Sequence, residues 1–234
     1  MTSTRAATFV LVHGSWHGGW CWKKLLPFME TGAAQVLTPT LTGLGERKHL
    51  ATRSTGLSQH IVDIVNVLEY EDLQDVILVG HSYSGLVITG VAERTNRVGK
   101  LVFLDAIVPE HGESMFSIIP GLEPDFRASV DSEGLVPSWA PENFGISDSR
   151  DLAWMTPRLT PMPILTHAEK LDAPLMKAKE LPRSFIHCAQ FGLGGFGEKI
   201  RGEGGDVYSL DTGHDAMVTE PQELAEILLQ HLRS

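Results

Sequence analysis

A short apolar strand that runs into a tight turn around Ser82 constrains this chain more than any other feature. Residues 76–79 read Val-Ile-Leu-Val, the turn reads Gly-His-Ser-Tyr-Ser-Gly, and residues 83–94 are compatible with a helix. In such a unit the backbone strain at the serine lifts its hydroxyl clear of the sheet, and the residues two before and two after it must be small. Gly80 and Ser84 meet this requirement, although Gly is more usual at the second position. The unit predicts a nucleophile at Ser82, with an ordinary turn and an exposed serine as the alternative.

A second tight turn follows the first apolar strand of the chain. Residues 9–12, Phe-Val-Leu-Val, lead into His-Gly-Ser-Trp-His at 13–17. A serine nucleophile needs donors for the oxyanion that its attack creates, and we expect the backbone amides of Ser15 and Tyr83 to supply them. The residues beside this spot that we expect to contact a substrate are Gly14, Trp16, His17 and His81. A structural role is the alternative for both histidines.

A candidate base lies near the end of the sequence. Residues 206–210 form an expected strand that ends in Asp-Thr-Gly-His-Asp, and a helix is expected from about 220 to 232. This order places His214 at the carboxyl end of a strand, the edge where open α/β sheets carry their sites. His214 is therefore expected to take the proton of Ser82.

Strand and helix patterns alternate through the first half of the chain. The expected strands are 8–12, 34–38, 75–79, 100–105, 184–188 and 206–210, and the expected helices include 19–30, 57–70 and 83–94. Such alternation predicts one α/β domain over residues 1–234, with a mostly parallel sheet of about six strands flanked by helices.

The alternation breaks after residue 109. Ten of the 13 prolines lie between Pro109 and Pro182, in a segment that also holds Trp139 and Trp154. We interpret residues 110–182 as a cap over the site, inserted after the strand that ends at Asp105, and we expect both tryptophans to contact substrate. A packed loop region whose aromatic residues serve only its own core is the alternative.

Four segments together resemble the α/β-hydrolase superfamily, in the branch of plant methylesterases, hydroxynitrile lyases and bacterial esterase relatives. They are residues 10–22, 76–85, 101–109 and 213–224, so the resemblance extends over nearly the whole chain. It implies the α/β-hydrolase fold and hydrolysis of a small hydrophobic or aromatic carboxylic ester, with methyl esters among the candidates. It also implies an acyl-enzyme on Ser82 and no metal or cofactor.

The chain departs from the plant pattern in its acid, because no carboxylate directly follows the strand 184–188. Asp105 is the best replacement, since it ends the strand beside that of Ser82. In this respect the chain is similar to certain haloalkane dehalogenases and cofactor-free dioxygenases. We expect Asp105 to hold His214 in the required tautomer, while capping of the next segment is its alternative role. The competing carboxylates are Asp211, Asp215 and Glu198.

Three other functions stay open at this point. A hydroxynitrile lyase is disfavoured because those enzymes carry Lys directly after the histidine, where this chain has Asp215. A cofactor-free dioxygenase is kept because of Asp105. A non-catalytic binding protein would be favoured if Asp105 lay far from His214.

The composition narrows the expected partners. A net charge of −10 argues against nucleic acid and anionic membrane as partners. The partner that the resemblance implies is a small-molecule ester. Nothing requires a homodimer, although one through the cap is compatible with the sequence. Cys21 and Cys188 are expected to be buried, without a disulfide or metal role. The first residues carry no apolar stretch, so we expect a cytoplasmic protein.

One motif is set aside. Residues 192–197 satisfy the pattern GxGxxG, but the helix expected after them, about 198–201, is too short for a dinucleotide-binding crossover. We interpret these glycines as a loop.

Overall fold

The centre of the molecule is a six-stranded sheet in which all neighbouring strands are parallel, in the order β2-β1-β3-β4-β7-β8. The structure, a computed structural model, describes residues 7–30 and 35–230. The strands are β1 (Thr8–Val12), β2 (Gln35–Leu37), β3 (Val76–His81), β4 (Val98–Leu104), β7 (Arg183–Cys188) and β8 (Asp206–Leu210). The prediction of about six mostly parallel strands is confirmed. The expected start of a strand at 34 and the expected end of a helix at 232 lie outside the described residues.

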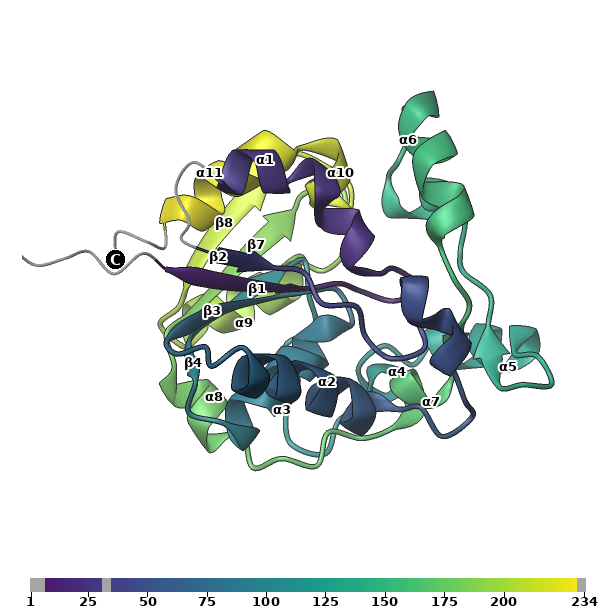
Figure 1. The fold of residues 1–234 in the computed structure, drawn as a ribbon, viewed down its shortest axis with the longest axis horizontal. Helices are drawn as coiled ribbons and strands as arrows, with labels where there is room; N and C mark the ends of the chain where they lie inside the picture. Colours follow the sequence, from purple (N-terminus) through teal and green to yellow (C-terminus); the bar gives the residue numbers. More distant parts are fainter. Residues whose placement is uncertain (1–6, 31–34, 231–234) are drawn as a thin grey trace, which may run out of the picture.

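Helices cover both faces of this sheet (Figure 1). One face carries α2 (Leu57–Tyr70), α3 (Ser84–Arg94), α8 (Met176–Glu180) and α9 (Gly194–Gly202). The other carries the 3-10 helix η1 (Gly19–Lys24) with α1 (Leu26–Met29), α10 (Ala216–Thr219) and α11 (Pro221–Gln230). Leu78 packs into the first core layer and Val79 into the second, because successive side chains of a strand point to opposite faces. Burial on both faces explains why β3 is an unbroken apolar run.

The chain between β4 and β7 forms a separate group of short elements. They are α4 (Met115–Ile118), α5 (Leu122–Ser129), β5 (Leu135–Val136), η3 (Pro141–Phe144), α6 (Ser149–Met155), η4 (Thr156–Arg158), β6 (Met162–Pro163) and α7 (Leu165–Ala168). Strands β5 and β6 pair in antiparallel fashion. In Figure 1, α4, α5 and α7 lie at the lower right, and α6 lies apart from them at the upper right. The remaining element is η2 (Gly45–Leu50). The interpretation of residues 110–182 as a cap stays a prediction.

Two sequence predictions about helices are wrong in detail. The expected helix 19–30 is divided into η1 and α1, because Pro27 lies at the start of α1 and has no backbone N–H to continue a helix. The glycines of 192–197 are not all loop, since α9 begins at Gly194. Close packing explains two of them: a Cβ added to Gly194 would lie 2.9 Å from the ring of His187, and one added to Gly197 would lie 3.1 Å from the ring of Phe185, so these two glycines let α9 approach β7.

Two other observations concern the cysteines and the length of the helices. Cys21 and Cys188 are buried and free, as predicted. Within residues 7–30 and 35–230, no helix combines the length and apolar character needed to cross a membrane.

Candidate active site

Ser82 occupies the strained turn that the sequence predicted. Its φ is +57°, in the left-handed region that residues with a side chain rarely adopt. A Cβ added to Gly80 would lie 2.7 Å from the carbonyl oxygen of Ser84, and one added to Gly85 would lie 1.8 Å from that of Ile107. Small residues are therefore a steric requirement here. Ser84 adds a bond of its own, because its hydroxyl donates to the carbonyl of His13.

The turn of Ser82 is tied to the end of β4. The backbone N–H of Ser82 donates to the carbonyl of Leu104 at 3.2 Å, and that of Ile107 donates to the carbonyl of Ser82 at 3.1 Å. Asp105 lies between these two contacts and has φ +40°. The residues on either side of Asp105 therefore hold the turn of Ser82 in place, while the N–H of Asp105 itself donates to the carbonyl of Ile186 at 2.8 Å.

Asp105 and His214 form a short, buried hydrogen bond. Nδ1 of His214 lies 2.6 Å from Oδ2 of Asp105, and their side chains are 5% and 0% exposed. The other oxygen of Asp105 accepts from the backbone N–H of Cys188 at 3.3 Å. Because a carboxylate only accepts, Nδ1 carries the hydrogen and Nε2 of His214 is left as a base.

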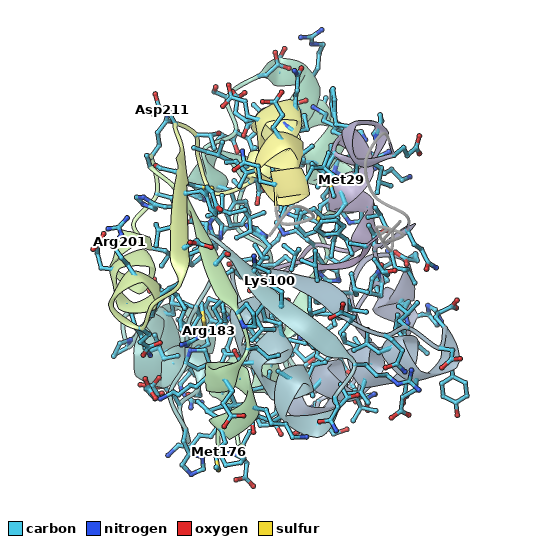
Figure 2. All side chains as sticks on the ribbon, turned by 90° about the vertical axis from the view of Figure 1, so that its left-hand side faces the viewer. Met29, Lys100, Met176, Arg183, Arg201 and Asp211 are labelled. Atoms are coloured by element: carbon cyan, nitrogen blue, oxygen red, sulfur yellow. The ribbon has the colours of Figure 1, made fainter. Side chains whose placement is uncertain are left out.

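The competing carboxylates lie elsewhere. Asp211 accepts from the side chain of Gln190, and Figure 2 shows it at the carboxyl end of β8 on the rim of the molecule. Glu198 is exposed and pairs with Arg201. Asp215 is fully buried and contacts two other histidines. Of the four candidate acids, Asp105 alone is placed to hold Nδ1 of His214.

A buried histidine–carboxylate pair supports the loop of Ser15. Nε2 of His17 lies 3.1 Å from Oδ2 of Asp215, and its Nδ1 donates to the carbonyl of Ser15 at 2.6 Å. Burial disfavours the charged form of each partner, but the charge and hydrogen bond of the other outweigh it. The pKa of His17 is raised, and that of Asp215 is lowered to about 2. The pair therefore fixes the Ser15 carbonyl and orients the peptide unit between Ser15 and Trp16.

The backbone amides of Ser15 and Tyr83 are available as donors. Among the hydrogen bonds of the described residues, neither amide is a donor to another group. Tyr83 directly precedes α3, so the positive end of that helix lies at the same place. Both amides can therefore serve an oxyanion.

His81 binds the backbone of the loop that carries His214. Its Nε2 donates to the carbonyl of His214 at 3.0 Å, and the two rings lie 4.5 Å apart. Burial and the neighbouring His214 lower the pKa of His81 well below its usual range, so its ring is neutral. A Cβ added to Gly14 would lie 2.9 Å from both Nδ1 of His81 and Cβ of Ser82, so Gly14 allows this close approach.

A cavity of about 260 Å³ lies beside these groups. The residues that line it are Ser15, Trp16, His17, His81, Ser82, Met115, Ile119, Leu122, Phe126, Trp139, Phe144, His167, Phe191, Gly192, Leu193 and His214. Ser82 and His214 thus face one mostly apolar chamber, and much of its wall comes from the segment between β4 and β7.

The structure separates the two tryptophans that the sequence grouped together. Trp139 lines the cavity and lies 5.1 Å from Trp16, ring centre to ring centre. Trp154 does not line it, because α6 places its ring on Trp20 at 5.2 Å, with Arg158 over it. The expectation that Trp154 contacts substrate is therefore corrected.

Among the lining residues that were not predicted, two contact His214 or Ser15 directly. Phe191 stacks on the ring of His214 with centres 4.1 Å apart and planes 21° apart. His167 faces Ser15, its Nε2 lying 3.1 Å from the Ser15 hydroxyl. Phe191 could have been predicted because it follows the carboxyl end of β7, at the edge of the sheet where the site lies. Nothing local in the sequence marks His167.

A metal site is not part of this arrangement. Among the residues that the structure describes, no group of three or more His, Cys, Asp or Glu side chains could hold a metal ion.

The chain is similar over most of its length to known alpha/beta hydrolases. The family described as the alpha/beta hydrolase family matches residues 9–227. The chain is 39% identical over 243 residues to the carbendazim hydrolyzing esterase of Nocardioides sp. (strain SG-4G), covering 95% of this chain and 98% of that protein. It is 27% identical over 249 residues to methylesterase 10 of Arabidopsis thaliana, covering 94% and 90% of the two chains. A solved extracellular alpha/beta-hydrolase from a Paenibacillus species, described as structurally and functionally homologous to tobacco salicylic acid binding protein 2, matches with a TM-score of 0.83. That structure is 26% identical and covers 96% of this chain and 98% of its own.

Proposed function

The chain belongs to the alpha/beta hydrolase family, and from that premise we propose that it is a serine carboxylesterase that cleaves small apolar or aromatic esters. One observation carries the proposal: Ser82 and the hydrogen-bonded pair of His214 and Asp105 meet at one apolar cavity. The resemblance noted in the sequence and the relatives named as esterases support the same reaction.

In the proposed reaction the Ser82 hydroxyl attacks the acyl carbon while Nε2 of His214 takes its proton. The amides of Ser15 and Tyr83 stabilise the oxyanion. His214 then protonates the departing alcohol, which leaves the acyl group on Ser82. Water repeats the cycle and releases the acid. No cofactor is required for any of these steps.

The proposed role of Asp105 is to orient the base. Its bond to Nδ1 keeps the lone pair of His214 at Nε2 and stabilises the imidazolium that forms when the proton arrives. Because Asp105 is fully buried, its charge acts with little screening by water.

The proposed substrates follow from the wall of the cavity. Aromatic and aliphatic side chains such as Trp139, Phe126 and Leu122 favour a compact apolar acyl group, and a small alcohol such as methanol fits the same volume. Two alternatives are disfavoured. A lyase would need a cation for departing cyanide, but no Lys or Arg is among the described residues that line the cavity, and Asp215 is buried beside it. The binding-protein alternative required Asp105 to be distant from His214, and the two are hydrogen-bonded.

The test is hydrolysis of p-nitrophenyl acetate and butyrate by the wild type, Ser82→Ala and Asp105→Asn. We expect kcat to fall by about a hundredfold or more in both variants. Ser82→Ala removes the nucleophile, and Asp105→Asn removes the carboxylate that holds His214. Asp211→Asn is the matched control, because it removes an exposed carboxylate at the same edge of the sheet. Full activity of Ser82→Ala would refute the proposal. Near-normal activity of Asp105→Asn would refute only the role of that acid.

A further inference from the structure

A chain of hydrogen bonds fixes which ring nitrogen of His167 carries the hydrogen. The Thr166 hydroxyl lies 2.7 Å from the carbonyl of Pro163, and a carbonyl can only accept, so Thr166 donates there. Nδ1 of His167 lies 3.0 Å from the same hydroxyl oxygen. Since the single hydrogen of Thr166 is already used, Nδ1 of His167 must be the donor in that contact.

Nε2 of His167 is therefore an acceptor as long as the ring is neutral. Burial, assisted by the charge of His60, lowers the pKa of His167 to about 3, and its side chain lies among aromatic rings, 5.0 Å from that of Tyr83. The Ser15 hydroxyl is 3.1 Å from Nε2 and must donate to it. The hydrogen of Ser15 is consequently used in the bond to His167, and the Ser15 oxygen offers only lone pairs to a bound molecule.

This acceptor has few equivalents in the chamber. Among the described lining residues, Ser15 and Ser82 are the two whose side chains carry an oxygen. Ser15 also supplies one of the proposed oxyanion amides, so its Oγ lies close to wherever the ester carbonyl binds. A donor that reaches Oγ must belong to an atom one or two bonds from that carbonyl.

We propose that Ser15 and His167 form an accepting subsite that selects esters with an O–H or N–H donor on the atom attached to the acyl carbon. Esters of α-hydroxy acids and carbamates with an N–H belong to this class. A substrate without the donor would leave the Ser15 lone pairs unsatisfied against an apolar group, which is the usual source of strong discrimination by buried polar atoms. The proposal rests on the proposed esterase function for its orientation of the carbonyl.

The test measures binding of three methyl esters to Ser82→Ala by calorimetry, so that no ester is hydrolysed. The esters are methyl phenylacetate, methyl mandelate in both enantiomers, and methyl α-methoxyphenylacetate. The α carbon carries no oxygen substituent in methyl phenylacetate, a hydroxyl in methyl mandelate and a methoxy group in methyl α-methoxyphenylacetate. The three esters therefore increase in size in that order. We expect one enantiomer of methyl mandelate to bind about tenfold tighter than both other esters, as one additional hydrogen bond provides. Affinities that follow size would overturn the proposal.

Two further variants separate the hydrogen bond from general packing. In Ser82→Ala/Ser15→Ala the preference for mandelate should shrink to about twofold or less, because the acceptor is gone while the backbone amide remains. Thr166→Val should also weaken it, because His167 can then exchange tautomers and release the Ser15 hydrogen into the cavity. Thr89→Val is the matched control: that buried hydroxyl donates to the carbonyl of Gly85 and does not line the cavity. Thermal melts establish that each variant is folded, and a preference that survives Ser15→Ala would overturn the proposal.

These affinities do not depend on turnover. Hydrolysis of methyl phenylacetate by the wild type tests the esterase function separately, because that ester has no donor. Failure of the subsite and failure of the proposed function would thus give different results.

Discussion

Replacing Asp215 by Asn should lower the stability of the fold more at acidic than at alkaline pH. Asp215 is fully buried between His17 at 3.1 Å and His81 at 3.6 Å, and Asn keeps its shape while removing its charge. Loss of one partner from a buried pair costs about 3–5 kcal/mol. For a domain of this size each kcal/mol shifts Tm by about 2–4 °C, so we expect Tm to fall by roughly 6–20 °C.

The pH dependence comes from His17. In the wild type its pKa is raised above the ordinary 6.5, despite burial, by the charge of Asp215. The resulting stabilisation is present below pH 6.5 and is lost as the pH rises through the folded pKa. In the variant, burial is opposed only by the weaker effect of the hydrogen bond to the Ser15 carbonyl and lowers the pKa of His17, so stability is lost as the pH falls below 6.5. Asp215 itself, with a pKa of about 2 when folded and 3.8 otherwise, stays ionised throughout this window.

Urea unfolding of both proteins at about pH 5.5 and about pH 8.5 measures the effect. The difference in free energy of unfolding between wild type and variant should be larger at the lower pH by about 1 kcal/mol or more, the value of one pKa unit. Asp211→Asn is the control, because it removes an exposed carboxylate four residues earlier in the chain and should change little at either pH. An equal difference at both pH values would refute the assignment of the charge to His17.

Two other substitutions test the packing around the site. Gly85→Ala should cost about 3 kcal/mol or more or prevent folding, since its Cβ would lie 1.8 Å from the Ile107 carbonyl oxygen, whereas Gly195→Ala, with open space around it, should change the midpoint of urea unfolding little. Trp139→Ala should raise kcat/KM for p-nitrophenyl octanoate relative to acetate by about fivefold or more, because it enlarges the cavity, whereas Trp154→Ala, outside the cavity, should leave that ratio unchanged. Equal ratios in the two tryptophan variants would contradict the assignment of Trp139 to the cavity wall.

The central strands of the sheet could be predicted because they contain nearly continuous apolar runs. Residues 75–79 were predicted to form a strand, and β3 extends from Val76 to His81 with every residue buried. A strand covered on both faces has no polar position that could blur its pattern. Helix α2 was predicted at its observed bounds for a related reason, since one face of it is apolar and the other is exposed.

Part of the candidate site could be predicted because some of its residues are close together in the sequence. The turn of Ser82 and the amides of Ser15 and Tyr83 depend on residues adjacent in the sequence. Asp105 was inferred from the place of its strand in the sheet, and it does lie beside His214, although its role in catalysis stays a prediction.

Contacts between distant, irregular segments could not be predicted. His167 meets Ser15 across 152 residues and His17 meets Asp215 across 198, and neither pair follows a helix or strand period. From the sequence, Asp215 was a competing acid for His214 and the residue found where the lyases have Lys, but not a partner of His17. Such partners are chosen by how the loops pack, which periodicity does not encode.

The position of Asp105 has a consequence for the shape of the cavity. The resemblance to plant enzymes would place an acid directly after β7, but in this chain that loop carries Phe191, whose ring covers one face of His214 at 4.1 Å. An acid on the adjacent strand β4 still reaches Nδ1 of the histidine, and β7 contributes the Cys188 N–H that supports it. The loop after β7 therefore does not need to supply a partner for His214, and its residues Phe191 and Leu193 form part of the apolar wall. The carboxylate on β4 and the aromatic ring on His214 are therefore two parts of one arrangement, in which the loop after β7 adds Phe191 and no carboxylate to the described wall of the chamber beside Ser82.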